Sequence, residues 1–169
     1  ILVGSYDNFL HCIDATTGTN RWKYKTDNYV NGAAAIADGQ AIFGGCDGDL
    51  YVVSIDQGEL VSRIGLGAPI AGTAAVVDKS AYIGHYGNQF VRVDLKDNQI
   101  EWTFEDQAFP FFSSAAIGHD RIVVGSRARR VYCLGLQDGQ EIWSIGVRGK
   151  VDSSPAICGD KVIIGSDDG

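Results

Sequence analysis

The apolar and polar positions along the chain form short runs that are typical of β-strands. Residues 90–94 (Phe-Val-Arg-Val-Asp) and 100–104 (Ile-Glu-Trp-Thr-Phe) alternate between apolar and polar side chains, as half-buried strands do. Residues 73–77 and 81–84 are runs of small and apolar side chains. No stretch of ten or more residues has a clean apolar period of about 3.6 residues, so we expect no helix longer than one turn. The pattern therefore predicts an all-β fold.

Residues that tolerate a positive φ separate these runs and favour tight turns between antiparallel strands. These turn pairs are Asp38-Gly39, Asp47-Gly48, Asp97-Asn98, Asp138-Gly139 and Gly159-Asp160. Together with the short runs, they predict a chain of hairpins.

The runs repeat about every 40 residues. One glycine closes a β-rich run in each repeat, and these anchor glycines, 40, 40, 41 and 40 residues apart, are Gly4, Gly44, Gly84, Gly125 and Gly165. Ten residues after the first four anchors come Asp14, Ser54, Asp94 and Gly135; fourteen after them come Gly18, Gly58, Asn98 and Gly139; eighteen after them come Trp22, Ser62, Trp102 and Trp143. A period of about 40–45 residues with four strands per unit marks a propeller blade.

Residues 12–22 (Cys-Ile-Asp-Ala-Thr-Thr-Gly-Thr-Asn-Arg-Trp) resemble the tryptophan-docking repeat of the pyrroloquinoline quinone (PQQ) propellers. Residues 137–143 repeat the second half of that motif, and residues 153–156 are similar to the inner strand of the family. The resemblance implies a β-propeller of four-stranded antiparallel blades, with about four blades here, which is half of an eight-bladed ring. We expect a single propeller fragment over 1–169, with repeats at about 1–41, 42–81, 82–122 and 123–163 and the start of a further blade at 164–169.

The tryptophan and aspartate columns have a structural explanation. An indole on an outer strand can lie across the seam to the next blade and bury roughly 150–250 Å², and an aspartate can accept hydrogen bonds from backbone N–H groups at a turn. Ser62 replaces the tryptophan in the second repeat, which predicts uneven docking between blades. The expected docking residues are Trp22, Trp102, Trp143, Asp14 and Asp94.

Composition changes this picture little. Hydrophobic residues make up 45% of the 169 positions and charged residues 21%, as in a globular domain. The net charge of −7 argues against nucleic acid or an anionic membrane as a partner. The four cysteines show no Cys-x-x-Cys spacing, which argues against a zinc or redox site, and Cys12 and Cys133 share a column that should be buried.

Residues with catalytic chemistry do not form a recognisable set. His11, His85 and His119 fall in different repeats without metal-ligand spacing. The serine pairs at 113–114 and 153–154 lie in the small-residue column, where a structural role is expected. We therefore expect no catalytic residue, no metal site and no cofactor, and we favour a protein that is not an enzyme. The alternative, PQQ with calcium, would need carboxylates and amides at the channel mouth, and the four repeats offer no obvious candidate.

Two departures from the repeat indicate a surface that binds a protein or peptide. Three arginines within residues 127–130 form a basic turn suited to a carboxylate or phosphate, the alternative being a solvated turn. Phe112 shares a column with Asn31 and Asp152 that should line the rim of the central funnel, where an exposed phenylalanine would anchor a partner. Phe111, beside it, should be core. The candidate partner-binding residues are Asn31, Phe112, Asp152, Arg127, Arg129 and Arg130.

Two functions follow from the resemblance. The first is a non-catalytic scaffold or sensor propeller, similar to the scaffold lipoprotein of the outer-membrane β-barrel assembly machinery, which implies a periplasmic or cell-envelope location. The second is part of a PQQ-dependent dehydrogenase whose cofactor ligands lie outside this chain. We favour the first, because regular short blades leave little room for an active-site roof. An open half-ring exposes strand edges, so we also expect a second copy or another half to complete it.

Overall fold

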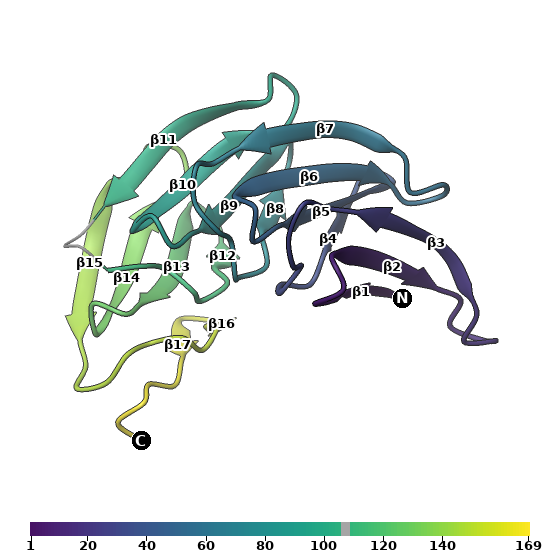
Figure 1. Ribbon diagram of the computed structural model, residues 1–169. Helices are drawn as coiled ribbons and strands as arrows, with labels where there is room; N and C mark the ends of the chain where they lie inside the picture. Colours follow the sequence, from purple (N-terminus) through teal and green to yellow (C-terminus); the bar gives the residue numbers. More distant parts are fainter. Residues whose placement is uncertain (106–108) are drawn as a thin grey trace.

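The computed structural model confirms the all-β fold. It describes residues 1–105 and 109–169, and within these ranges the secondary structure consists of seventeen β-strands without a helix. The strands form five antiparallel sheets that follow one another along an arc (Figure 1). The three complete sheets have four strands each, so they are the blades of a propeller.

The strand bounds follow the turns expected from the sequence. The first sheet holds β1 (Leu2–Gly4), β2 (Phe9–Ile13) and β3 (Asn20–Lys25). The second holds β4 (Ala35–Ala37), β5 (Gln40–Gly44), β6 (Asp49–Ser54) and β7 (Leu60–Gly65). The third holds β8 (Ala75–Val77), β9 (Ser80–Gly84), β10 (Gln89–Asp94) and β11 (Gln99–Glu105). The fourth holds β12 (Ala116–Gly118), β13 (Arg121–Ser126), β14 (Arg130–Gly135) and β15 (Glu141–Gly146), and a last hairpin holds β16 (Ala156–Cys158) and β17 (Lys161–Ile163).

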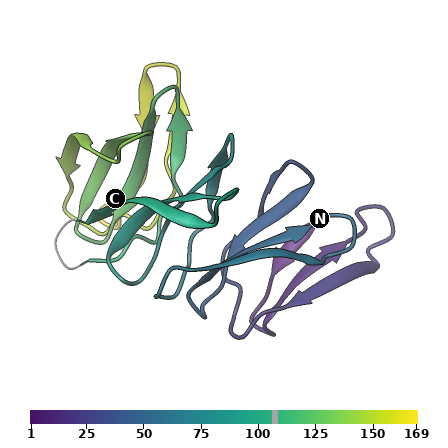
Figure 2. The same ribbon diagram turned by 90° about the horizontal axis from the view of Figure 1, so that it is seen from above.

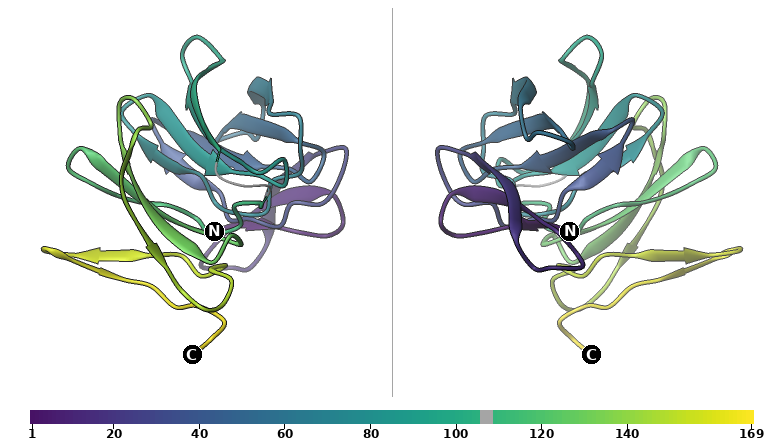
Figure 3. Two further views of the ribbon diagram at one scale, coloured as in Figure 1. Left: turned by 90° about the vertical axis from the view of Figure 1, so that its left-hand side faces the viewer. Right: turned by 90° about the vertical axis from the view of Figure 1, so that its right-hand side faces the viewer.

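Each complete sheet is an antiparallel meander in which neighbours in sequence are neighbours in space. The first sheet and the C-terminal hairpin lie at the two ends of the arc (Figures 2 and 3). The innermost strand of the second sheet is shorter than the small-residue run suggests: β4 covers only residues 35–37, because residues 32–34 pack against the next connection instead of joining the sheet.

The apolar core lies between neighbouring sheets. One buried cluster joins the second and third sheets through Ile42, Val52 and Val93, and similar clusters fill the other seams. Phe111 is fully buried, which confirms the core position expected for it. Cys12 and Cys133 are also buried, as expected, and both are free thiols.

The anchor glycines mark a close approach between a strand and a connection. In each of the four repeats, a buried residue of the connection to the next sheet covers the anchor glycine. A Cβ at Gly84 would lie 2.8 Å from the carbonyl oxygen of Phe111 and closer still to its Cβ. The covering residues are Val30, Ile70, Phe111 and Val151, over Gly4, Gly44, Gly84 and Gly125 respectively. This column is glycine because any side chain there would overlap the core.

A ladder of hydroxyl groups ties the connections together. The backbone N–H of Ala33 donates to Oγ1 of Thr73 (3.1 Å), that of Thr73 to Oγ of Ser114 (2.9 Å), and that of Ser114 to Oγ of Ser154 (3.2 Å). The glycines one residue earlier also touch: a Cβ at Gly32 would lie 2.6 Å from the carbonyl oxygen of Gly72. The small-residue column therefore serves both close packing and hydrogen bonding between blades.

Candidate functional site

The candidate site lies on the face of the arc where the middle hairpin of each sheet meets the connection to the next sheet. Tyr86, from the hairpin between β9 and β10, packs its ring on Phe112, with ring centroids 4.2 Å apart. Arg127, from the hairpin between β13 and β14, places its guanidinium carbon 3.9 Å from the centroid of the Phe112 ring. Asp152 follows in the next connection and binds Arg127. We call these four residues, Tyr86, Phe112, Arg127 and Asp152, the rim cluster.

Arg127 is held by a bidentate ion pair. Its Nε donates to Oδ1 of Asp152 at 2.9 Å and its Nη2 donates to Oδ2 at 2.7 Å. The hydrogen bond to this carboxylate raises the pKa of Arg127 above its usual range. The sequence suggested a basic turn open to an anionic ligand, but the Arg127 charge is already paired, because the next connection brings Asp152 within reach. Phe112 is half-buried between Tyr86 and Arg127 and is not fully exposed.

The other sequence candidates lie outside this cluster. Arg129 has a positive φ of 61° and an exposed side chain, while Arg130 donates from Nη1 to Oγ of Ser144 at 2.9 Å. Asn31 is exposed in the connection before the second sheet, and the connection carrying Ala71 separates it from Phe112. The structure thus brings together three of the six candidates and adds Tyr86. Tyr86 stands two residues after an anchor glycine, in the same column as Arg127, and this shared column was the available signal for it.

The first seam holds a tryptophan at its outer edge. The Trp22 ring covers Gly58 of the second sheet, so that a Cβ at Gly58 would lie 2.6 Å from Cδ2 of the indole. The indole Nε1 donates to the carbonyl oxygen of Ile55 at 2.9 Å. Position 58 favours glycine for two reasons: a side chain would overlap the indole, and the backbone has a positive φ of 71°.

The third seam repeats this geometry with one difference. Trp102 covers Gly139, where a Cβ would lie 2.6 Å from Cε3 of the ring. The carbonyl of Leu136, which corresponds to that of Ile55, accepts instead from the hydroxyl of Tyr82 at 3.3 Å. Trp102 Nε1 is buried and has no hydrogen-bond partner among residues 1–105 and 109–169. In the third seam the Tyr82 hydroxyl therefore binds the backbone carbonyl that corresponds to the indole's acceptor in the first seam.

The aspartate column acts locally at the turns. Oδ1 of Asp14 accepts from the backbone N–H groups of Thr16 (3.0 Å) and Thr17 (2.9 Å), which lowers the pKa of Asp14. Asp94 caps its own turn in the same way and its pKa is also lowered. In the fourth repeat Gly135 replaces the aspartate, and Asp138 accepts from the N–H of Gln140 at 3.1 Å. These aspartates stabilise the turns, and none of these hydrogen bonds crosses a seam.

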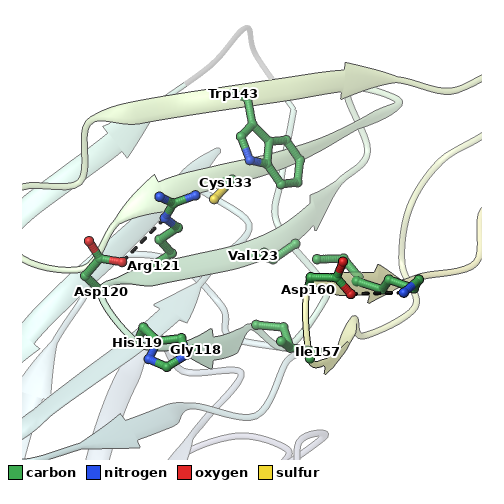
Figure 4. A pocket seen from close by; sticks show the side chains of 12 residues that line it. Gly118, His119, Asp120, Arg121, Val123, Cys133, Trp143, Ile157 and Asp160 are labelled. Carbon is green, nitrogen blue, oxygen red and sulfur yellow. Dashed lines mark hydrogen bonds and ion pairs between the residues drawn. The ribbon is translucent and has the colours of Figure 1, made fainter.

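Trp143 lines an open cavity of about 330 Å³ beside the C-terminal hairpin (Figure 4). Cys133 and Val123 form the cavity wall on the side of the fourth sheet, and Ile157 and Val162 form the wall on the side of the C-terminal hairpin. Two ion pairs flank it, Asp120 with Arg121 and Asp160 with Lys161 (Figure 4). In the first and third seams the corresponding space holds a turn of the next sheet, packed against the indole.

Within residues 1–105 and 109–169, no group of three or more His, Cys, Asp or Glu side chains lies close enough together to hold a metal ion. His85 is buried, its Nδ1 accepts from the N–H of Gly87 at 3.0 Å, and burial lowers its pKa. It occupies the column of Ser5 and Ser126, which cap the same turn. No helix long and apolar enough to cross a membrane occurs in the part of the chain that the structure describes.

Comparison with known proteins gives one consistent family. Residues 1–61 and 110–169 match the family described as outer membrane protein assembly factor BamB. The chain is similar to the BamB protein of Yersinia pestis, with 27% identity over 160 residues that cover 85% of this chain and 40% of that protein. It is also similar to BamB of Shewanella oneidensis, with 22% identity over 186 aligned positions that cover 100% of this chain and 46% of that protein.

A solved structure agrees in fold. The crystal structure of BamB from Moraxella catarrhalis superposes with a TM-score of 0.85 at 15% identity, covering 98% of this chain and 55% of that one. The chain therefore spans about half the length of the relatives that it matches.

Proposed function

This chain belongs to the family of outer membrane protein assembly factor BamB, and on that premise we propose that it is a non-catalytic propeller scaffold that binds a protein partner. We further propose that the partner takes part in outer-membrane protein assembly and that the chain works in the bacterial cell envelope. The family name supports both points, because the relatives are described as assembly factors. No cofactor is part of this proposal.

The rim cluster is the observation that carries the binding surface. A half-buried phenylalanine held between a tyrosine and an ion-paired arginine is fixed before any partner arrives, so its ordering costs little on binding. Tyrosine and arginine are enriched among the residues that dominate the energy of protein interfaces. Tyr86 exposes 46% of its surface and offers the cluster to solvent. Exposed Asn31 and Arg129 would lie at the edge of the same face.

Replacing Phe112 with serine tests this surface. We expect a loss of partner binding, because the anchor side chain is gone, and a loss of stability of about 2 kcal/mol, since the half-buried ring makes one cation–π contact and one ring contact that each contribute roughly 1 kcal/mol. The free energy of unfolding is measured by denaturant titration. A loss of several kcal/mol would show that Phe112 is a core residue and contradict the proposal.

Site-specific photo-crosslinking in cells with an outer membrane supplies the binding measurement. A benzophenone side chain at position 112 should form an adduct with an outer-membrane assembly protein. The matched control places it at Ile142, which is 46% exposed and is the second residue of the outer strand β15, at the end of the sheet opposite the rim cluster. An adduct at Ile142 alone, or none at either position, would contradict a partner site at the rim.

We also propose that the chain can pair with a second copy to complete a ring. Gly18 has a φ of 71° and no atom within 4 Å of its Cβ position, whereas its counterparts Gly58 and Gly139 are covered by tryptophans. Trp143, beside its open cavity, is the matching tryptophan at the other end of the arc. Residues 162–169 occupy the same repeat positions as residues 1–8, so pairing must displace one of the two segments.

Sedimentation equilibrium at micromolar concentration checks this pairing. We expect a dimer, and we expect Trp143→Ala to weaken it at least tenfold, about 1.4 kcal/mol, because the docking ring is lost. Ile145→Ala, at a position 57% exposed on the same strand, serves as the control and should leave the dimer unchanged. A compact monomer in the unmodified chain would contradict the pairing and leave the rim proposal standing.

A further inference from the structure

The seam between the second and third sheets lacks the aromatic group that the seams on either side contain. Trp22 fills the first seam and Trp102 the third, each against a glycine of the next sheet. In the second seam Ser62 stands in the tryptophan column and pairs with Val52 in the strand register, as Trp22 pairs with Cys12. Ser62 Oγ is buried and has no hydrogen-bond partner within the described ranges.

A cavity of about 270 Å³ opens at this seam. Ile42 of the second sheet and Leu95 of the third form its apolar walls. Asp38, Asp78, Lys79 and Lys96 surround it with charges of both signs. Ile42 shares a column with Val123, which lines the cavity beside Trp143, and Leu95 shares a column with Ile55, whose carbonyl accepts the Trp22 N–H.

The chemistry of this cavity matches an indole ring. An enclosed apolar cavity of ~150 Å³ is large enough to hold benzene. This hollow of about 270 Å³ is open to solvent and leaves room for two fused rings, with apolar contacts from Ala37, Ile42 and Leu95. The carbonyl of Leu95 corresponds to that of Ile55, which accepts the Trp22 N–H in the first seam, and across the described residues no side chain donates to it. An incoming N–H would therefore find the same acceptor at the same place.

One residue separates this seam from its neighbours. Asn98, with a φ of 55°, takes the place of Gly58 and Gly139. In the first seam the Trp22 ring lies against Gly58, and the Asn98 Cβ takes up the corresponding space in the second seam. A ring that enters the second seam must therefore lie closer to Ile42 and Leu95. The site is not filled from within the chain because Ser62, in the tryptophan column, carries no ring.

We propose that the second seam is a binding site for a tryptophan side chain presented by a polypeptide partner. In the two neighbouring seams the fold accepts an indole against the turn that corresponds to residues 95–98, and Leu95 of this turn lines the cavity. Acidic and basic side chains at the opening suit the backbone and flanking residues of a peptide better than a free apolar molecule. The site lies at the turns between β4 and β5, between β8 and β9 and between β10 and β11, at the ends of the strands opposite the rim cluster, and is independent of it.

The test is a titration with N-acetyl-tryptophanamide followed by backbone amide resonances. In the unmodified chain we expect saturable shifts at Leu95, Lys96, Asp78 and Lys79. Asn98→Gly should bind more tightly, because it removes the side chain from the position that the indole covers in the neighbouring seams and keeps a residue that adopts positive φ freely. The double variant Ser62→Trp with Asn98→Gly rebuilds the filled seam and should weaken binding at least tenfold.

Val61→Trp is the matched control. It adds the same ring to the same strand on the opposite side, at a position 53% exposed, and should bind the probe as the unmodified chain does. If the double variant does not fold, Ser62→Leu fills the cavity in its place. Shifts that do not saturate, that scatter over the surface or that persist in the filled variant would overturn the proposal. Free indole binding more than tenfold tighter than the probe would overturn the polypeptide as its source.

Discussion

Gly84→Ala is expected to destabilise the protein by about 3 kcal/mol, which is the upper part of the range for overpacking a core. Gly84 lies in β9 with its Cα against the connection that carries Phe111, and an added Cβ would lie 2.8 Å from the carbonyl oxygen of Phe111. Backbone atoms in a fully buried segment cannot move aside cheaply, so the seam itself must open. Denaturant titration measures the change in the free energy of unfolding.

Gly146→Ala is the control for this effect. Gly146 also lies in a strand, but no atom comes within 4 Å of its Cβ position and its φ is outside the left-handed region. There the alanine should be neutral or stabilising by up to about 1 kcal/mol, since it reduces the freedom of the unfolded chain. Equal midpoints for the two variants would show that Phe111 does not rest on Gly84 as described.

Trp102→Ala is expected to cost about 3 kcal/mol, at the lower end of the range for removing a large aromatic side chain. The ring covers Gly139 and packs near Tyr82 and Phe90, with centroid distances of 5.9 and 6.2 Å, but it keeps part of its surface exposed. Its buried N–H has no partner among the described residues, so its removal also relieves a small cost. A variant that unfolds at the parental midpoint would exclude a docking role for this column.

Phenylalanine substitutions separate ring packing from hydrogen bonding. Trp22→Phe loses the bond to the carbonyl of Ile55, which contributes roughly 0.5–1.5 kcal/mol, in addition to some packing. Trp102→Phe loses packing alone, because its N–H makes no bond in the structure that is described. The first substitution should therefore be the more costly, when both are measured by the same denaturant titration.

The fold could be predicted from the sequence because its main determinants recur at a fixed spacing. An anchor glycine, a turn pair and a tryptophan column in each repeat identify the blade, and the covering column places Phe111 in the core. The hydroxyl ladder was not foreseen. A serine or threonine in a column of small residues indicates size, while the bond between Thr73 and Ser114 depends on how two blades converge in space.

The candidate site was predicted only in part, for a related reason. Phe112 was found because it departs from its column at the expected rim, and Asp152 because it shares that column. Their contacts with Arg127 were not predicted, since residues 15 and 25 positions apart meet only when a hairpin of one sheet approaches the connections on either side of that sheet. The same approach brings Tyr86 to Phe112. Departures from a repeat therefore locate a surface, while the pairing of charges across blades decides what that surface can still bind.

The hydroxyl ladder has a direction, so the two ends of the arc present different groups for hydrogen bonding. The hydroxyl oxygens of Thr73 and Ser114 each accept a hydrogen bond from the connection before, and their backbone N–H groups donate to the connection after. Only contacts in the same direction along the chain can therefore continue the series. Ser154 presents an N–H at one end, while Ala33 at the other end has no hydroxyl to receive one. A ring made from two identical copies would lack this N–H to hydroxyl hydrogen bond at each of its two joints, because Ala33 has no hydroxyl. A second half with serine or threonine at that position would supply the missing hydrogen bond at the joint.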